Sequence, residues 1–455
     1  MVEELTIGQV LDLAVKKHQE GKLEDAKFLY RKILEANPKN PDAWHLFGVL
    51  EHQLGNNNFA LRYILEAIKI NPNVAVFHGN LGMVYDALED GEESAKHFQK
   101  ALELNPKYDK AYLAHYNLGV YFKDIGDIGK SIEHYTKSID LKDDFFESHW
   151  NRGLVLLLLG KFKEGWEDYE YRFKKQSPVG TRNFNKPSWD GSSLEGKKIL
   201  IISEQGFGDN IQFVRYLLLV KEKGAYIILQ CKKELKKLFE GFPGIDEIVE
   251  KGQGISNLDF DYYIHIMSLP KVFNTNLENI PNKIPYLKAD KELVKKFKNK
   301  FDPGDFKVGI VWAGNPEQAD DKNRSTIFEN FRSLLDISGL KFFSLQKGKA
   351  SEQLDDPRVI DLSKEINDFS DTAAILDNLD LVISVDTSVL HLAGSMGKSC
   401  FGLLCFIPDW RYFLDRKDSP WYSNMKLFRQ NKQGEWSGVF EEVKKELELL
   451  VNKKV

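Results

Sequence analysis

Residues 382–404 read VISVDTSVLHLAGSMGKSCFGLL, and this stretch decides the fold of the second half of the chain. The apolar run Leu381–Val385 is typical of a buried parallel strand. Asp386, Thr387 and Ser388 follow, and all three residue types cap helices, so we expect a helix over Val389–Met396 and a strand over Cys400–Leu404. Backbone N–H groups at such a turn, with the positive helix end, suit an anion. The alternative is an ordinary βαβ crossover whose turn only caps its helix.

Length and composition narrow the class of protein. A chain of 455 residues is long enough for two to four domains. Its net charge of −5 gives no electrostatic footprint for nucleic acid. The three cysteines, Cys231, Cys400 and Cys405, have neither metal-ligand nor disulfide spacing, which indicates reduced thiols. The chain shows no signal-peptide pattern and no apolar run long enough to span a membrane, so we expect a cytoplasmic protein.

The first third of the chain is periodic. Pro38, Pro72 and Pro106 are 34 residues apart, and small residues keep the same phase at Ala26, Ala60, Ser94, Ser131 and Gly165. The step from Gly82 to Gly119 is 37, which indicates three inserted residues near 108–112. The pattern resembles the tetratricopeptide repeat (TPR), two antiparallel helices per 34 residues. It predicts an α-solenoid of about five repeats over residues 1–176, because single repeats cannot bury their apolar faces.

Three asparagines share one position in these repeats. Asn80, Asn117 and Asn151 each lie two residues before the repeat glycine, on the first helix of a unit. A carboxamide donates and accepts hydrogen bonds at once, which suits an extended peptide backbone. The arrangement resembles the asparagine-lined TPR groove of protein O-GlcNAc transferases and implies a protein or peptide acceptor. The alternative is that these amides only solvate an exposed helix face.

After a linker at residues 177–197, strands alternate with helices over residues 198–290, which predicts a parallel sheet. We expect a strand at Ile199–Ser203 and a helix from about Asp209 to Lys223. Two glycines precede that helix, but Ile211 stands where a dinucleotide fingerprint needs a third glycine, so NAD is disfavoured. Asp209 lies at the helix amino terminus, where a carboxylate stays ionised and can accept a proton from a hydroxyl. A plain helix cap is the alternative.

A second α/β series fills residues 291–455 and places a cleft between two halves. We expect a helix at Ile327–Leu335, and a final helix at Phe440–Val451 that returns to brace the first half. Three polar residues follow strand ends or precede a helix. Arg324 offers bidentate geometry for a pyrophosphate, Lys347 is expected to face a ribose or base, and Asn315 lies in the loop after the first strand. For each basic residue alone, a solvated surface charge is the alternative.

The segment Asp386–Ala393 followed by Gly397-Lys398 resembles the signature of glycosyltransferase family 9, the ADP-heptose:lipopolysaccharide heptosyltransferases. Gly208-Asp209 is similar to that family's early Gly-Asp turn. The resemblance covers roughly residues 198–430 and implies a GT-B fold, two Rossmann-like domains, that inverts configuration without a metal or a further cofactor. It implies that Asp209 is the catalytic base.

The same resemblance implies a binding site for a nucleotide-diphosphate sugar. The N–H groups of Thr387, Ser388 and Val389 would hold the donor phosphates, and Asp386 and His391 would contact the sugar. Arg324 would take the place of the family's phosphate-binding basic residue. Asn315 stands where that family is expected to have hydroxyl residues, which is a departure from the pattern.

Two further motifs have simpler explanations. Asp259-Phe260-Asp261 has the D-x-D form of metal-dependent glycosyltransferases, but it precedes a strand far from the phosphate turn, which disfavours a metal role. The aromatic residues in Pro408–Tyr412 and Ser419–Tyr422 are expected to pack the carboxyl-terminal elements rather than bind sugar.

The sequence therefore predicts an inverting glycosyltransferase joined to a TPR array that presents a protein acceptor. A catalytically inactive TPR scaffold is the first alternative. A lipopolysaccharide transferase that uses its repeats only for assembly is the second.

Overall fold

The computed structural model describes residues 5–174, 185–204, 206–253, 258–318 and 320–452. The chain divides into two compact units, residues 1–155 and residues 156–455. Residues 177–184 of the expected linker lie outside the described residues. The domain bounds drawn from the repeat phase, with the array ending at 176, stay a prediction.

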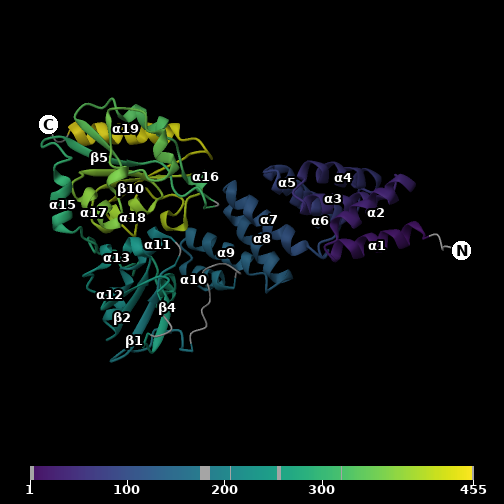
Figure 1. The fold of residues 1–455 in the computed structure, drawn as a ribbon, viewed down its shortest axis with the longest axis horizontal. Helices are drawn as coiled ribbons and strands as arrows, with labels where there is room; N and C mark the ends of the chain where they lie inside the picture. Colours follow the sequence, from purple (N-terminus) through teal and green to yellow (C-terminus); the bar gives the residue numbers. More distant parts are fainter. Residues whose placement is uncertain (1–4, 175–184, 205, 254–257, 319, 453–455) are drawn as a thin grey trace. The chain divides into compact units, whose positions relative to one another are not determined.

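The first unit is a series of helix pairs, drawn in purple and blue in Figure 1. Within a pair the two helices pack on each other, and from the first pair to the fourth each second helix also packs on the first helix of the next pair. The helices are α1 (Ile7–Gln19), α2 (Leu23–Ala36), α3 (Pro41–Gln53), α4 (Asn57–Ile70), α5 (Ala75–Ala87), α6 (Gly91–Leu104), α7 (Ala111–Asp124), α8 (Ile128–Leu141) and the start of α9 (Phe146–Leu158). The helical repeat predicted from the 34-residue period is confirmed.

Small residues make the close crossings within a pair possible. A Cβ atom at Gly119 would lie 2.6 Å from the ring of Tyr135, so only glycine lets α7 approach α8 this closely. The small residue Ser131 faces the same crossing, and its hydroxyl donates to the Gly119 carbonyl at 2.7 Å. Gly82 and Ser94 repeat both features in the preceding pair. The periodic small residues are therefore packing positions.

The second unit contains a four-stranded parallel sheet, drawn in teal in Figure 1. Its strand order is β3-β2-β1-β4. The strands are β1 (Lys198–Ile202), β2 (Tyr226–Cys231), β3 (Glu247–Glu250) and β4 (Tyr262–His265). The helices of this half are α11 (Phe207–Phe213), α12 (Tyr216–Lys221), α13 (Lys233–Phe239) and α14 (Leu269–Val272), with η3 at Ile266–Ser268. Before them come α10 (Phe162–Tyr169) and the short 3₁₀ helix η1 (Glu170–Phe173).

A second parallel sheet has six strands in the order β10-β9-β8-β5-β6-β7. This is the doubly wound order, with its switch point between β5 and β8, where such sheets bind ligands. The strands are β5 (Phe306–Val311), β6 (Leu340–Ser344), β7 (Val359–Asp361), β8 (Leu381–Val385), β9 (Cys400–Leu404) and β10 (Met425–Arg429). The accompanying helices are α15 (Lys291–Lys298), α16 (Asp321–Arg324), α17 (Phe369–Asp377), α18 (Ser388–Ser395) and α19 (Ser437–Asn452), with 3₁₀ turns η4 (Phe328–Leu334), η5 (Lys349–Gln353), η6 (Ser363–Glu365) and η7 (Trp410–Tyr412).

The final helix differs from expectation. The helix α19 buries Val443 and Leu447 in the core of the second sheet, beside Ile310 of β5 and Phe331 of η4. Figure 1 shows it in yellow over that sheet. The expectation that it braces the first half is wrong, because its apolar stripe matches the uncovered face of the sheet that it follows in the chain.

Two helices of the α/β unit also differ from the sequence pattern. The helix expected over Asp209–Lys223 is broken into α11 and α12 around Val214 and Arg215. Arg215 is buried and its Nε donates to the Gln212 carbonyl at 2.8 Å, so the side chain satisfies a group at the end of α11. The segment expected to be a helix at Ile327–Leu335 is the 3₁₀ helix η4.

Candidate functional site

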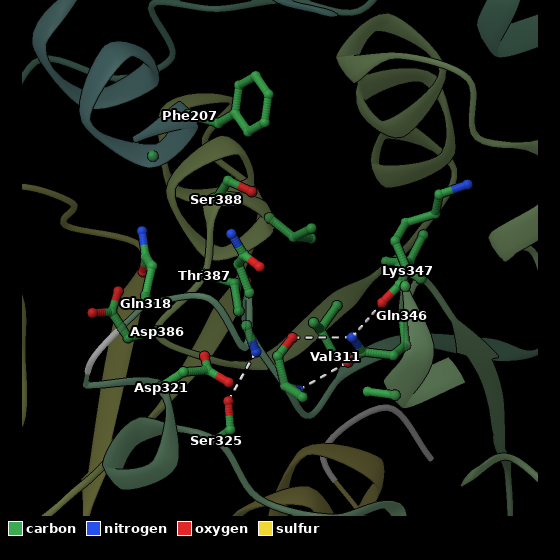
Figure 2. Close-up of a pocket in the computed structure, with 18 of the residues that line it drawn as sticks. Phe207, Val311, Gln318, Asp321, Ser325, Gln346, Lys347, Asp386, Thr387 and Ser388 are labelled. Atoms are coloured by element: carbon green, nitrogen blue, oxygen red, sulfur yellow. Dashed lines mark hydrogen bonds between the residues drawn. The ribbon is translucent and has the colours of Figure 1, made fainter. Parts of the chain in front are cut away.

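One cavity of about 1090 Å³ gathers residues from both halves of the α/β unit. Its first-half wall includes Gly206–Asp209, and its second-half wall includes the loops after β5, β6 and β8. Figure 2 shows Asp386, Thr387 and Ser388 opposite Gln346 and Lys347, with Phe207 above them. Since the second sheet reverses its strand order between β5 and β8, the cavity lies at that switch point.

All the cavity residues predicted from sequence line this one space. They are Asp209, Asn315, Arg324, Lys347, Asp386, Thr387, Ser388, Val389 and His391. Their positions agree with a shared site; the role of each stays a prediction.

Asp209 lies in the first turn of α11, three residues after the helix cap Gly206. Its side chain is 29% exposed. A Cβ atom at Gly206 would lie 2.3 Å from Asp209 Oδ2, so a side chain at this position would displace the carboxylate. The carboxylate therefore faces the cavity beside the N–H groups that begin α11.

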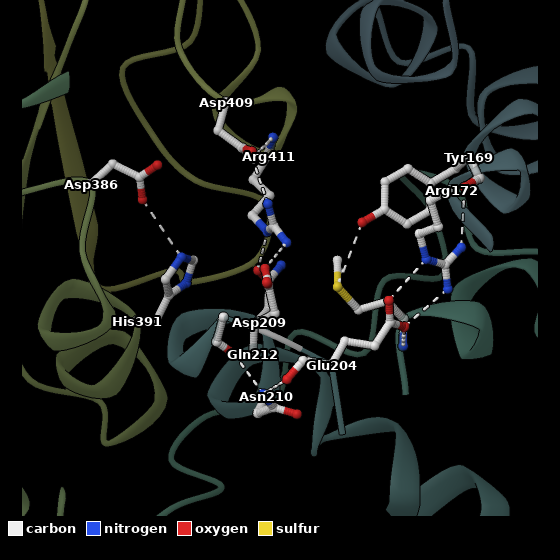
Figure 3. Close-up of polar contacts among 12 residues, drawn as sticks. Tyr169, Arg172, Glu204, Asp209, Asn210, Gln212, Asp386, His391, Asp409 and Arg411 are labelled. Atoms are coloured by element: carbon white, nitrogen blue, oxygen red, sulfur yellow. Dashed lines mark hydrogen bonds and ion pairs between the residues drawn. The ribbon is translucent and has the colours of Figure 1, made fainter. Parts of the chain in front are cut away.

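Arg411 holds this carboxylate and was not among the residues predicted from sequence. Its Nη2 donates to Asp209 Oδ1 at 2.5 Å, its Nη1 to Asp409 Oδ1 at 2.8 Å, and its Nε to Gln212 Oε1 at 2.5 Å. Figure 3 shows Arg411 between the two carboxylates. Burial and the charge of Asp386 raise the pKa of Asp409, although Arg411 acts against them.

The loop that carries Arg411 also packs the unit, as the sequence indicated. Trp410 and Trp421 are buried and their rings lie 5.8 Å apart in a T-shaped contact. Arg411 follows the end of β9 in the chain, on the edge of the sheet where ligands bind. That position was the available signal for Arg411.

Asp386 and His391 form a polar pair on the donor side. His391 Nε2 lies 3.6 Å from Asp386 Oδ1, and the Tyr412 hydroxyl donates to the same oxygen at 2.8 Å. Burial acts to raise the pKa of Asp386, but His391, Arg324 and Tyr412 together bring it well below its usual range. Asp386 is therefore an ionised acceptor at the cavity wall.

His391 also joins the two halves. Its Nδ1 lies 3.0 Å from the Tyr422 hydroxyl, and the side chain is buried. A Cβ atom at Gly208 would lie 2.7 Å from His391 Cδ2, so the glycine lets α11 pack on α18. The two sequence motifs, Gly208-Asp209 and Asp386–His391, are in direct contact.

The turn after β8 presents the start of α18 to the cavity. Thr387 is the helix cap, and its hydroxyl hydrogen-bonds Ser384 at 2.8 Å rather than pointing to solvent. Ser388 and Val389 are the first two helical residues, whose N–H groups have no partner inside a helix. These groups and the helix dipole favour an anion at this position.

The basic residues of the cavity are held by their neighbours. Arg324 Nε donates to Asp321 Oδ1 at 3.1 Å, and its guanidinium lies over Gly314, where a Cβ atom would be 2.5 Å from Nη2. Lys347 Nζ donates to the carbonyls of Ser363 and Ile366 at 2.8 and 2.9 Å.

Asn315 is exposed at the rim of the cavity, and its Oδ1 accepts from Glu317 N at 3.2 Å. Gln346, also missed from sequence, fixes the loops beside it. Its Oε1 accepts from the N–H groups of Trp312 and Ala313, and its Nε2 donates to Ala313 O.

The asparagines of the array are partly committed to internal bonds. Asn80 is buried, and its Nδ2 lies 2.7 Å from His45 Nε2 in the preceding repeat. Asn151 Nδ2 donates to the Tyr116 hydroxyl at 3.2 Å, also across one repeat, while Asn117 donates to Leu113 O at 2.9 Å. Only Asn117 and Asn151 keep intermediate exposure. The peptide groove stays a prediction.

The D-x-D segment lies at the opposite edge of the first sheet from the cavity. Lys198, the first residue of β1, donates from its Nζ to Asp259 and from its backbone N to Asp261, both at 2.9 Å. Within the described ranges no three His, Cys, Asp or Glu side chains converge in a way that could hold a metal ion. Nor does any helix there have the length and apolarity to span a membrane.

Family models identify the repeats. Models described as tetratricopeptide repeat match residues 41–74, 75–108 and 112–145. The gap of three residues before 112 agrees with the insertion inferred from the glycine spacing. The first unit therefore contains TPRs, a repeat that typically contacts other proteins.

Similarity to one named protein extends beyond the repeats. The protein FlbA of Caulobacter vibrioides is 27% identical over 443 residues, which cover 90% of this chain and 73% of FlbA. Human tetratricopeptide repeat protein 6 is 33% identical over 93 residues, 20% of this chain and 18% of that protein. The crystal structure of MamA aligns with a TM-score of 0.32 at 24% identity, covering 36% of this chain and 94% of MamA.

The tetratricopeptide repeat matches support protein interaction through the array and so favour the scaffold alternative. The matched family models cover the repeats and not the α/β unit.

Proposed function

We propose that the α/β unit transfers a sugar from a nucleotide-diphosphate sugar to a hydroxyl group, and that the acceptor is a protein or peptide bound by the TPR array. The proposal rests on one observation: Asp209 and the turn of Asp386–Val389 line the same cavity. A carboxylate on one wall and a helix amino terminus on the other are the two groups that such a transfer needs.

The proposed step moves one proton and one electron pair. Asp209 takes the proton of the acceptor hydroxyl, and the oxygen bonds to the anomeric carbon. The bond from that carbon to the phosphate oxygen breaks, and the nucleoside diphosphate leaves with the electron pair. Inverted configuration follows from a single displacement. Arg411 holds Asp209 Oδ1, which leaves Oδ2 as the base.

Groups of the second half stabilise the negative charge of the departing nucleoside diphosphate in this scheme. The N–H groups of Ser388 and Val389 are directed at the cavity by the start of α18, and Arg324 adds a cation. Asp386, ionised and held by Tyr412, accepts from a sugar hydroxyl in this scheme. The proposed step uses these protein groups and no metal ion.

The base assignment is tested by Asp209→Asn. The expected result is a loss of turnover by a factor of about 10²–10⁴, with nucleotide binding retained, because the base acts only on the acceptor. Asp259→Asn is the matched control, since Asp259 pairs with Lys198 away from the cavity. Equal loss of turnover and nucleotide affinity in Asp209→Asn contradicts the assignment. His391→Ala should instead weaken mainly donor affinity.

A protein scaffold with an inactive α/β unit is the second candidate. The family matches to the repeats favour it, and so does the Asp209–Arg411 ion pair, which occupies one oxygen of the proposed base. Thermal-shift titration with ADP-, UDP- and GDP-sugars separates the two. Stabilisation by one donor supports the transferase, and stabilisation by none supports the scaffold.

The acceptor is tested in the array. Asn117→Ala with Asn151→Ala should lower modification of a protein acceptor while leaving release of nucleotide in its absence unchanged. Asn80 is left intact because its removal would leave buried His45 without this partner. Unchanged acceptor modification would favour a non-protein acceptor, as in a lipopolysaccharide transferase.

A further inference from the structure

The carboxyl edge of the first sheet has its own switch point, between β1 and β4. Glu204 follows β1, and Ser268 ends the 3₁₀ helix η3 that follows β4. Both residues contact Arg172 of η1. Arg172 Nε lies 2.9 Å from Glu204 Oε2, and its Nη2 lies 3.0 Å from Oε1, a bidentate pair. Figure 3 shows Arg172 and Glu204 beside Tyr169. The crevice where a sheet of this order binds ligands is occupied by the chain's own arginine.

This pair is buried and its remaining hydrogen-bonding groups are used. Arg172 and Glu204 are 7% and 5% exposed. Glu204 Oε1 accepts from Met267 N at 3.1 Å, and Arg172 Nη2 donates to Ser268 Oγ at 2.8 Å. Although burial acts to raise the pKa of Glu204, Arg172 lowers it, so the pair is ionised. A satisfied, bidentate pair of this kind fixes geometry more strongly than a surface ion pair does.

Glu204 is tied to the turn that carries Asp209. Asn210 Nδ2 donates to Glu204 O at 3.1 Å and to Gly206 O at 2.6 Å. Asp209 is the residue next to Asn210. Glu204 is therefore held by Arg172 through its side chain and contacts, through its backbone carbonyl, the residue next to Asp209.

A second contact starts from α10, which directly precedes η1 in the chain, and leads to the loop that carries Arg411. Trp166 of α10 donates from Nε1 to Thr275 O at 2.9 Å, and its ring meets Trp410 in a T-shaped contact at 5.2 Å. Trp410 directly precedes Arg411, the residue that holds Asp209 Oδ1. The segment α10–η1 thus contacts both the turn before Asp209 and the loop that supplies its cation.

We propose that Arg172 is a positioning residue for Asp209, and that α10–η1 is part of the reaction site although the sequence assigns it to the repeat array. The inference rests on the proposed function for the catalytic meaning of Asp209. Whether Arg172 orders the α11 turn can be measured without catalysis.

The experiment compares full-length variants by hydrogen–deuterium exchange over residues 207–213. Arg172→Met and Glu204→Gln each remove one partner, and Arg172→Lys keeps the charge while losing the bidentate geometry. The matched control is Lys221→Met, which removes the cation of a Lys221–Asp246 pair in the same half. Thermal-shift titration with ADP, UDP and GDP reports the donor side in every variant.

The expected result is about tenfold faster exchange at 207–213 in the Arg172 and Glu204 variants, because local opening follows the loss of anchoring contacts. Nucleotide shifts should stay at the wild-type level, and Lys221→Met should leave the segment unchanged. Where the wild type transfers sugar, Arg172→Lys should lower kcat at least about tenfold with unchanged KM for the donor.

Wild-type exchange at 207–213 in folded Arg172→Lys and Glu204→Gln would overturn the inference, whatever the activity. If Arg172→Met fails to fold, the two milder variants decide. If the wild type transfers no sugar from any donor, the proposed function fails, while exchange still decides whether Arg172 orders the α11 turn.

Discussion

Arg411 and Asp209 are 202 positions apart in the chain, yet Arg411 Nη2 donates to Asp209 Oδ1 at 2.5 Å. The same guanidinium bonds Asp409 and Gln212, so each of its nitrogens is used. One buried cation from the second half therefore sets the orientation of the carboxylate proposed as base in the first half.

Arg411→Lys should reduce sugar transfer by about 10- to 100-fold, because an ammonium cannot hold two carboxylates and an amide in one plane. Nucleotide affinity should change little. Steady-state kinetics with the best donor measure both. Arg416→Lys is the control, since Arg416 pairs with Asp418 at the surface. Unchanged turnover in Arg411→Lys would show that the ion pair does not serve the base.

Gly208→Ala should disturb the contact between the halves, because the new Cβ would lie 2.7 Å from His391 Cδ2. Overpacking of this kind costs about 1–3 kcal/mol. Thermal unfolding of the single variant, of His391→Ala and of the double variant measures the coupling. The double variant should be less destabilised than the sum of the single ones. Additive losses would contradict the close approach of α11 to α18.

The array should lose stability in mild acid through His45. Burial, with the charge of Lys110, lowers the pKa of His45 from 6.5 to about 4. The unfolded chain therefore binds a proton as the pH falls through 6.5, and the folded array does so only near pH 4. Stability contributed by neutral His45 is present above pH 6.5 and is lost between 6.5 and 4.

The size of this loss is about 3 kcal/mol, from the difference between the two pKa values. Urea unfolding followed by helical circular dichroism at pH 7 and pH 4.5 measures it. His45→Gln keeps an acceptor for Asn80 and cannot titrate. This variant should therefore lose less stability between these pH values than the wild type does. The same pH dependence in both proteins would exclude His45 as the cause.

Gly119→Ala should destabilise the array by about 1–3 kcal/mol, since its Cβ would meet the ring of Tyr135 at 2.6 Å. Gly8→Ala in α1 is the matched control. A Cβ there meets only Thr6 Oγ1, at 4.0 Å, so the substitution should be neutral or stabilise by up to about 1 kcal/mol. Thermal unfolding distinguishes the two, and equal shifts would contradict the role of the repeat glycine.

The sequence predicted what depends on local pattern. The 34-residue period indicated the helix pairs, and the apolar run before Asp386 indicated β8 and the start of α18. Asp209 and His391 were predicted as parts of one site, and the structure brings them to one cavity. The helix pairs and strand ends could be predicted because they depend on neighbouring residues, whereas the role of each cavity residue stays a prediction.

What the sequence did not reveal depends on tertiary contacts. Nothing near Arg411 indicates that its partner is Asp209, and nothing near Arg172 indicates Glu204. The break between α11 and α12 arises because buried Arg215 bonds to Gln212 O, Trp421 O and the Tyr286 hydroxyl, groups brought near only by folding. The position of α19 likewise depends on the fold, because the helix packs on the face of the second sheet that other elements leave free.

The two sheets share part of their strand order. The first sheet is ordered β3-β2-β1-β4, and the first four strands of the second, β7-β6-β5-β8, follow the same order. The second sheet extends beyond this shared order by β9 and β10 at one edge. Arg411 lies in the chain between these two strands. The cation that holds Asp209 is thus supplied by the part of the second sheet that has no counterpart in the first.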